Sequence, residues 1–166
     1  AGARQEEPPP ESFMTIEQLR KRDISAKQEV QHTVDLKGYL GLVRLLRENL
    51  QNEYVLWRAT RALRDIVHSN QEIRNDVVRN KADEVILNVI DAYPNSAVVQ
   101  SQAIRLIGSL SYGNDVVRRR VGENSGIKRI VAAMDNHITD ETVQLHACTT
   151  LTNLFHNSHD NRFRFL

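Results

Sequence analysis

Side chains that could support catalysis or metal binding are few in this chain and lie apart in sequence. His156 and His159 form an H-x-x-H pair, with Asp160 beside the second histidine. Zinc sites need three or four protein ligands, and no cysteine or further histidine pair is close in sequence. We therefore expect these histidines to occupy a helix cap and a turn. The single cysteine, Cys148, follows a helix core position, and we expect it to be a small buried residue.

Signatures of the common enzyme classes do not occur in the sequence. There is no G-x-x-x-x-G-K-[ST] phosphate loop, no G-x-G-x-x-G dinucleotide loop, no H-E-x-x-H zinc motif and no G-x-S-x-G nucleophile elbow. Serine, histidine and aspartate residues are present, but nothing in their spacing brings a nucleophile and a base together. We predict that the protein is not an enzyme and needs no metal or other cofactor.

Composition and charge indicate a folded protein without an overall electrostatic target. Hydrophobic side chains make up 40% of the chain, too many for a disordered protein, and the net charge is +1. This balance gives no field that would attract nucleic acid, and we expect Arg118–Arg120 to be a solvated run on a short convex helix. No apolar run reaches the ~18–20 residues of a membrane span. One cysteine fits a reducing compartment, the cytoplasm or the nucleus.

A 44-residue repeat runs through most of the chain without insertions. Ala59, Ala103 and Ala147 are each separated by 44 residues. The same interval relates Val55, Val99 and Val143; Leu63, Ile107 and Leu151; Ile66, Leu110 and Leu154; and Arg74, Arg118 and Arg162. Several columns of matched size and chemistry indicate a repeated supersecondary unit.

Each unit has the pattern of three helices. In residues 54–68 apolar and small side chains follow the i, i+4, i+7, i+8 spacing of an amphipathic helix. Gly38 and Gly126 each open a shorter helix that precedes a long one, and glycine there permits a sharp turn with positive φ. The shorter helices are predicted at 39–50, 83–93 and 127–137, and short charged helices at 71–80, 115–121 and from 159 onward.

The third unit resembles a known family. Residues Gly126 to Met134 are similar to a G-x-x-x-(L/I)-V-x-x-(L/M) segment, Val143 to Leu154 to a V-Q-x-x-A-x-x-x-L-x-N-L segment, and Asn161-Arg162 to an N-x-R segment. Together these segments resemble the armadillo repeat family, with HEAT repeats as the nearest alternative. The resemblance implies an all-α fold, a right-handed α-solenoid of three armadillo-type repeats with an N-terminal helical cap.

The predicted organisation follows from the period and the resemblance. Residues 1–12 are expected to be a disordered, proline-rich leader. Residues 13–37 would form the capping helices, including the first short helix of repeat one. The repeats themselves are predicted at 38–81, 82–125 and 126–166, the last interpreted as truncated from a longer array.

The resemblance also implies a concave groove along the long helices, where partners of the family bind. Polar side chains opposite the apolar stripe would point into it, and successive long helices would lie about 10 Å apart. The predicted groove residues are Tyr54, Arg58, Arg61, Asp65, His68, Gln102, Arg105, Ser109, Tyr112, His146, Thr149, Asn153 and His156.

The charges of this predicted groove favour an acidic ligand. Arg58, Arg61 and Arg105 would form a patch suited to carboxylates, with Tyr54 and Tyr112 as aromatic anchors at its edges. The alternative is a solvated polar face, in which Arg61 pairs with an aspartate, Asp65, one helical turn further on.

The row of asparagines that clamps a peptide backbone in the family is mostly replaced in this chain. An amide suits that role because it both donates and accepts a hydrogen bond. The equivalent positions here are Asp65, Ser109 and Asn153. The family's tryptophan position four residues earlier holds Arg61 or Arg105 in two repeats, while Trp57 lies elsewhere and is expected in the core or between repeats.

The leading interpretation is a scaffold or adaptor that binds an extended peptide or a helix of a protein partner, acidic rather than basic, along this groove. Two alternatives stay open. One is a regulator or effector module of a small GTPase, and the other is a structural component of a cytoskeletal complex. Self-association through exposed repeat ends is a further alternative, whereas a nucleic acid partner is not expected.

Overall fold

The computed structural model describes residues 14–165, and in this part of the chain every regular element is a helix. The predicted leader at 1–12 lies outside the described residues. The prediction of an all-helical fold is confirmed for the described residues. The helices are α1 (Ile16–Glu48), α2 (Glu53–Ser69), α3 (Gln71–Arg79), α4 (Ala82–Ala92), α5 (Ala97–Ser111), α6 (Asp115–Glu123), α7 (Gly126–Asn136), α8 (Glu141–Phe155) and α9 (His159–Phe165).

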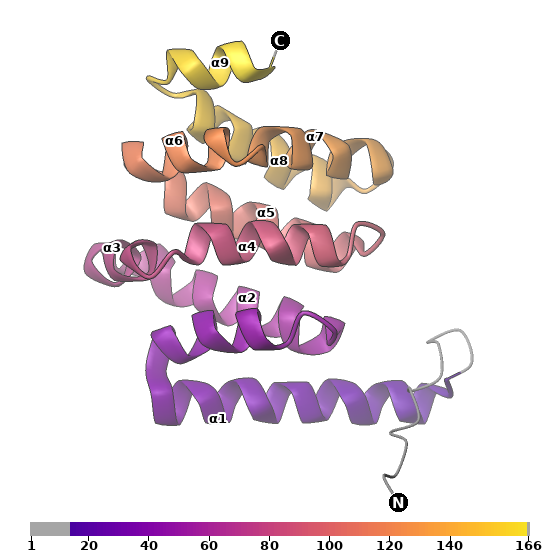
Figure 1. Cartoon of the computed structure of the whole chain (residues 1–166). Helices are drawn as coiled ribbons and strands as arrows, with labels where there is room; N and C mark the ends of the chain where they lie inside the picture. The colour runs from indigo at the N-terminus through magenta and orange to yellow at the C-terminus, as the bar shows by residue number, and fades with distance from the viewer. Residues whose placement is uncertain (1–13, 166) are drawn as a thin grey trace, which may run out of the picture.

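These helices lie in successive layers, with α1 at one end of the stack and α7, α8 and α9 at the other (Figure 1). Polar caps at 44-residue intervals start the long helices. Asn52, Ser96 and Asp140 each accept a hydrogen bond from the backbone N–H three residues further on, at 3.3, 3.3 and 2.9 Å. Such caps satisfy backbone donors that a helix N-terminus leaves unpaired. None of the described helices is both long and apolar enough to cross a bilayer.

The first helix is two helices joined at a sharp bend. Gly38 interrupts α1 with a φ of 62° and a ψ of −159°, which glycine adopts without the steric cost of a Cβ. The expected turn at Gly38 is therefore confirmed. At Gly126 the expectation is wrong, because the positive φ of 58° belongs to Ser125. Gly126 instead allows close packing, since an added Cβ would lie 2.4 Å from Val121 Cγ1.

The core lies where the long helices α2, α5 and α8 pack in sequence. Ala59, Ala103 and Ala147 are completely buried, as the repeat predicts for a close approach of neighbouring helices. A recurring glutamine ties each later long helix to the helix before it. Gln100 Nε2 donates to the carbonyl oxygens of Ile90 and Tyr93 at 2.8 Å each. The glutamine 44 residues further on makes the equivalent pair of bonds, at 2.8 and 3.0 Å.

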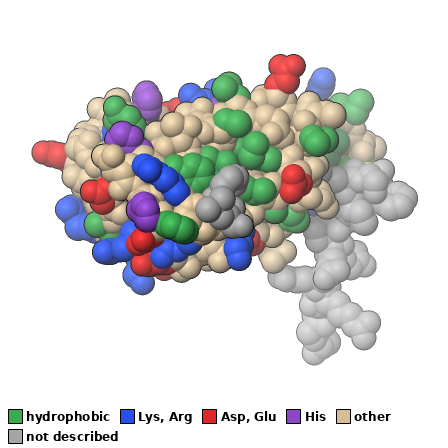
Figure 2. Space-filling model, turned by 90° about the horizontal axis from the view of Figure 1, so that it is seen from above, with side chains coloured by type: hydrophobic (Ala, Val, Ile, Leu, Met, Phe, Trp, Pro, Cys, Tyr) green, Lys and Arg blue, Asp and Glu red, His purple; other side chains and the backbone are tan. Residues whose placement is uncertain are grey.

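The outer face of α8 lacks the cover that the earlier long helices have. Cys148 is exposed, so its predicted burial is wrong. Its equivalents Thr60 and Ile104 are completely buried, because another long helix packs over each of them. Figure 2 looks onto this end of the stack and shows hydrophobic side chains grouped across it. Leu145 and Ile138 are among the exposed apolar residues at this end.

Candidate functional site

A groove of about 590 Å³ lies between α5 and α8, and its lining also includes His68 of α2 and Arg74 of α3. We call it the α5/α8 groove. It brings together seven residues of the predicted groove: His68, Arg105, Ser109, Tyr112, His146, Thr149 and Asn153. Four further lining residues were not predicted: Arg74, Gly108, Leu145 and Thr150.

Arg58 does not join this groove, and its place in the predicted arginine patch is wrong. Its guanidinium forms a two-pronged ion pair with Asp23 of α1, at 2.8 Å from Nε to Oδ1 and 2.5 Å from Nη2 to Oδ2. It also lies over the ring of Trp57, 4.4 Å from the centroid. Trp57 is half-buried against the core, as expected. The arginine is therefore already paired and holds α1 against α2.

Asp65 does not pair with Arg61, contrary to the predicted alternative. Asp65 Oδ1 accepts hydrogen bonds from Nε and Nη2 of its neighbour Arg64, at 3.0 and 2.5 Å. Arg64 Nη1 also donates to Gln102 Oε1 at 2.6 Å, which links α2 to α5. Arg61 is exposed and does not line the α5/α8 groove. The predicted groove residues Tyr54, Arg58, Arg61, Asp65, Gln102 and His156 thus all lie outside it.

The charged side chains that line the α5/α8 groove are basic. Arg74 and Arg105 line it together with two histidines, and no aspartate or glutamate is among its described lining residues. Arg105 is exposed and makes no ion pair within the described part of the chain. Tyr112 and Leu145 stand at its edge with 66% and 64% of their surface exposed. The groove therefore combines positive charge with two exposed, largely apolar side chains.

The hydroxyl groups of the groove direct their protons into the helices. Ser109 Oγ donates to the carbonyl of Arg105 at 3.2 Å, and Thr149 Oγ1 donates to that of Leu145 at 2.9 Å. The amide nitrogen of Asn153 donates to the carbonyl of Gly108 at 3.2 Å. These groups keep oxygen lone pairs to offer a ligand. Arginine guanidinium groups must therefore supply most of the hydrogen-bond donors.

The surroundings of His146 lower the pKa of its imidazole and so favour the neutral form. Burial lowers the pKa of its imidazole, a hydrogen bond to the carbonyl of Ser101 opposes that shift, and the nearby charges of Arg105 and Arg64 lower the pKa further. The Nδ1 atom lies 3.1 Å from the Ser101 oxygen. Because a carbonyl oxygen only accepts, Nδ1 carries the proton and Nε2 offers a lone pair. Protonation of His146 would add another positive charge to the groove.

Arg74 belongs to the column of arginines that recurs every 44 residues. Its Nε and Nη2 donate to the carbonyl oxygens of Val67 and His68 at 3.3 and 3.4 Å. The later members repeat this geometry, since Arg118 Nη1 donates to Ser111 O at 3.0 Å. Arg162 Nε likewise donates to the carbonyl seven residues before it, at 3.1 Å. The column was visible in the sequence, but its role, tying each short helix to the end of the preceding long helix, was not.

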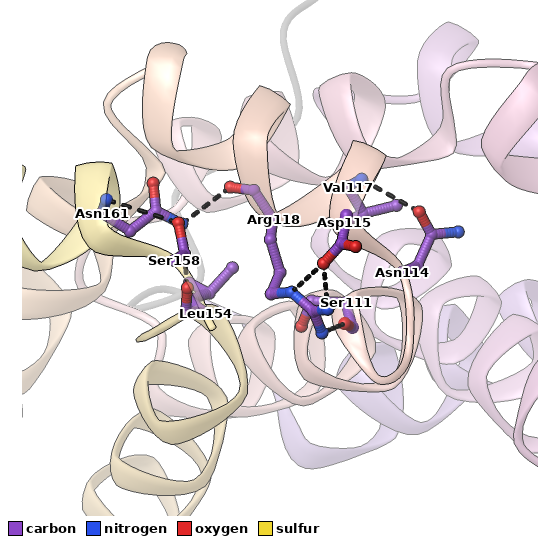
Figure 3. A network of polar contacts seen from close by, with 8 residues as sticks. All are labelled: Ser111, Asn114, Asp115, Val117, Arg118, Leu154, Ser158 and Asn161. Atoms are coloured by element: carbon purple, nitrogen blue, oxygen red, sulfur yellow. Dashed lines mark hydrogen bonds and ion pairs between the residues drawn. The ribbon is translucent and has the colours of Figure 1, made fainter. Parts of the chain in front are cut away.

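Arg118 shows that the basic run is not a solvated one. It is 7% exposed and is paired with Asp115 in a network that also involves Ser111 (Figure 3). Arg120 forms an ion pair with the buried carboxylate of Asp83, 2.8 Å from Nε to Oδ2. Arg119 alone of the three is exposed. The expectation of a solvated run is therefore wrong for two of its three residues.

Comparisons with known proteins found no match for this chain. No protein-family model matches it, and neither does any curated protein or solved structure.

Within residues 14–165, no group of three or more histidine, cysteine, aspartate or glutamate side chains is arranged to hold a metal ion. His159 packs against Phe163, with ring centroids 4.7 Å apart.

Proposed function

We propose that this protein is a non-enzymatic interaction scaffold that binds an acidic segment of a protein partner in the α5/α8 groove. The observation that carries the proposal is the groove's charge: two arginines and two histidines line it, with no carboxylate among the described lining residues. Surface arginines are usually distributed among acidic neighbours, as Arg44 is with Glu48. An uncompensated pair in a hollow is suited to carboxylates.

The proposed architecture is an armadillo-type, right-handed α-solenoid. Its support is the recurrence of helix starts, caps and buried alanines at 44-residue intervals. The bend at Gly38 separates a capping helix from the first shorter helix, as such an array requires at its N-terminal end. In an array of this kind the long helices α2, α5 and α8 would line one face, where the α5/α8 groove lies.

Binding energy would come from a few anchors rather than from the whole surface. Tyr112 and Leu145 offer apolar area at the groove edge, and aromatic residues are common at interface hot spots. Arg105 offers guanidinium donors that no carboxylate of the described chain occupies. The lone pairs of Ser109, Thr149 and Asn153 would accept hydrogen bonds from the backbone N–H groups of an extended segment.

A selection from a library of random displayed peptides tests this proposal. We expect the protein to enrich acidic sequences, and Arg105→Glu to weaken their binding by at least about tenfold, or ~1.4 kcal/mol. Arg61→Glu and Arg119→Glu are matched controls, because both arginines are exposed and neither lines the groove. Equal losses in all three variants would indicate general charge attraction and would overturn the proposal, as would a selection that enriches no peptide.

A further inference from the structure

Arg74 is a buried cation that no carboxylate of the described residues neutralises. It is 9% exposed and forms no ion pair within the described residues. Its counterpart in the next repeat, Arg118, is equally buried but is paired with Asp115. The position equivalent to Asp115 in repeat one is Gln71, which is neutral. The third member, Arg162, also lacks a carboxylate but is exposed, so that water can solvate it.

The hydrogen bonds of Arg74 compensate its charge only weakly. Its two bonds to carbonyl oxygens are 3.3 and 3.4 Å long, near the upper limit for an N–H···O bond. Its Nη1 atom makes no hydrogen bond with a described residue and is not among the fully buried unpaired atoms. Arg74 also lines the α5/α8 groove, and its Nη1 has hydrogen-bond donors that no described residue takes up. A buried cation without a carboxylate partner is unfavourable, and an anion entering the groove would relieve that cost.

We infer that Arg74 is the anchor for an oxyanion of the bound segment, and that Gln71 keeps this anchor free. The inference rests on the proposed function and adds the chemical group that is recognised. That group is a carboxylate or a phosphoryl group, because both have the oxygen geometry that a guanidinium binds through two hydrogen bonds. Arg105, from α5, provides the second positive charge of the groove lining. The two hydrogen bonds to the carbonyl oxygens of Val67 and His68, here called the carbonyl clamp, hold Arg74 in place before the ligand arrives, so little side-chain entropy is lost on binding.

The test uses small anions and the Nε–Hε signal of Arg74, observed by nuclear magnetic resonance and assigned with Arg74→Lys. We expect this signal to shift saturably with acetate and with inorganic phosphate, but not with chloride at the same ionic strength. The Arg118 signal is the internal control and should not respond, because Asp115 occupies that guanidinium. Acetate and phosphate are separate arms, and their relative affinities decide between a carboxylate and a phosphoryl group.

The decisive variant is Gln71→Asp, which gives Arg74 the internal carboxylate that Arg118 has. We expect apparent affinity for the preferred anion to fall about threefold, because the added carboxylate competes for the guanidinium, while the Arg74 signal stays resolved because the fold is intact. An unresponsive Arg74 in the unmodified protein, or an unchanged response in Gln71→Asp, overturns the inference. If anions bind as expected but the displayed library enriches nothing, the oxyanion site stands and the peptide-binding function fails. If acidic peptides bind equally to Gln71→Asp, the function stands and the role of Arg74 fails.

Discussion

Two equivalent regions of this molecule join a short helix to the preceding long helix through an arginine, but only one of these arginines is paired with a carboxylate. At the start of α6, Arg118 ties its helix to the end of α5 and its charge is met by Asp115. At the start of α3, Arg74 ties its helix to the end of α2, with Gln71 where the carboxylate would be. The arginine that binds the end of the preceding long helix is therefore common to both regions, whereas its carboxylate partner is not. The missing counter-charge, in the region that opens on the groove, is what we connect with a role in binding rather than in folding.

Replacing each clamp arginine with methionine should give the largest difference between the two regions. Arg118→Met removes an ion pair and leaves the carbonyl of Ser111 without this bond, and we expect a loss of about 2 kcal/mol. Arg74→Met loses two longer bonds but also removes an uncompensated buried charge, so we expect less than about 1 kcal/mol. Urea unfolding of both variants measures this difference. Equal losses would show that the missing carboxylate has no energetic consequence.

Exchanging the counter-charges should produce smaller, opposite effects. Gln71→Asp should stabilise the protein and Asp115→Asn should destabilise it, each by about 0.5 kcal/mol, because Asp115 is largely solvent-exposed. Asp115→Asn should also make the Arg118 Nε–Hε signal respond to acetate, as that of Arg74 does.

An acidic residue at a helix N-terminus is favourable even without an arginine partner, so this exchange needs its own control. Gln71→Asp in the Arg74→Met background isolates the pair, because only the interaction with Arg74 is absent there. The idea of a missing counter-charge fails if Gln71→Asp stabilises both backgrounds equally.

The 44-residue columns predicted where the helices of both regions begin, because helix starts and caps depend on local sequence that recurs at this interval. The same alignment already contained Gln71 opposite Asp115, so the difference in charge could have been read from it. The ion pair of Arg58 could not, since its partner Asp23 lies in the predicted N-terminal cap, ahead of the aligned repeat columns. Contacts between layers depend on packing that a single sequence does not encode locally.

The predictions for Cys148 and Asp65 were also wrong, each for a simple physical reason. Cys148 was expected to be buried because it follows the core residue Ala147, but no further long helix of the described chain packs over the outer face of α8. Asp65 was assigned to Arg61 by helical spacing, yet it pairs with its immediate neighbour Arg64, which also reaches Gln102 on α5. Helical spacing alone does not reveal this arrangement, because Arg64 is positioned by its contact with Gln102 on the neighbouring helix.

The smallest expected effect is a dependence of stability on pH. It concerns the groove, because His146 lines the groove and takes no part in the Arg118 network. Burial first, and then the charges of Arg105 and Arg64, lower its pKa below the ordinary 6.5. The unfolded chain therefore takes up this proton more readily than the folded protein, so that stability is fully present above pH 6.5 and falls as the pH decreases toward the lower folded pKa. We expect the melting temperature to fall between pH 7 and pH 5.5 by more in the unmodified protein than in His146→Gln, a change that keeps a polar side chain but removes the titration. An anion bound at Arg74 and Arg105 should reduce this fall, because it offsets the positive charge that opposes protonation. An equal fall in both proteins would show that other groups dominate the acid response and that His146 does not sense the charge of the groove.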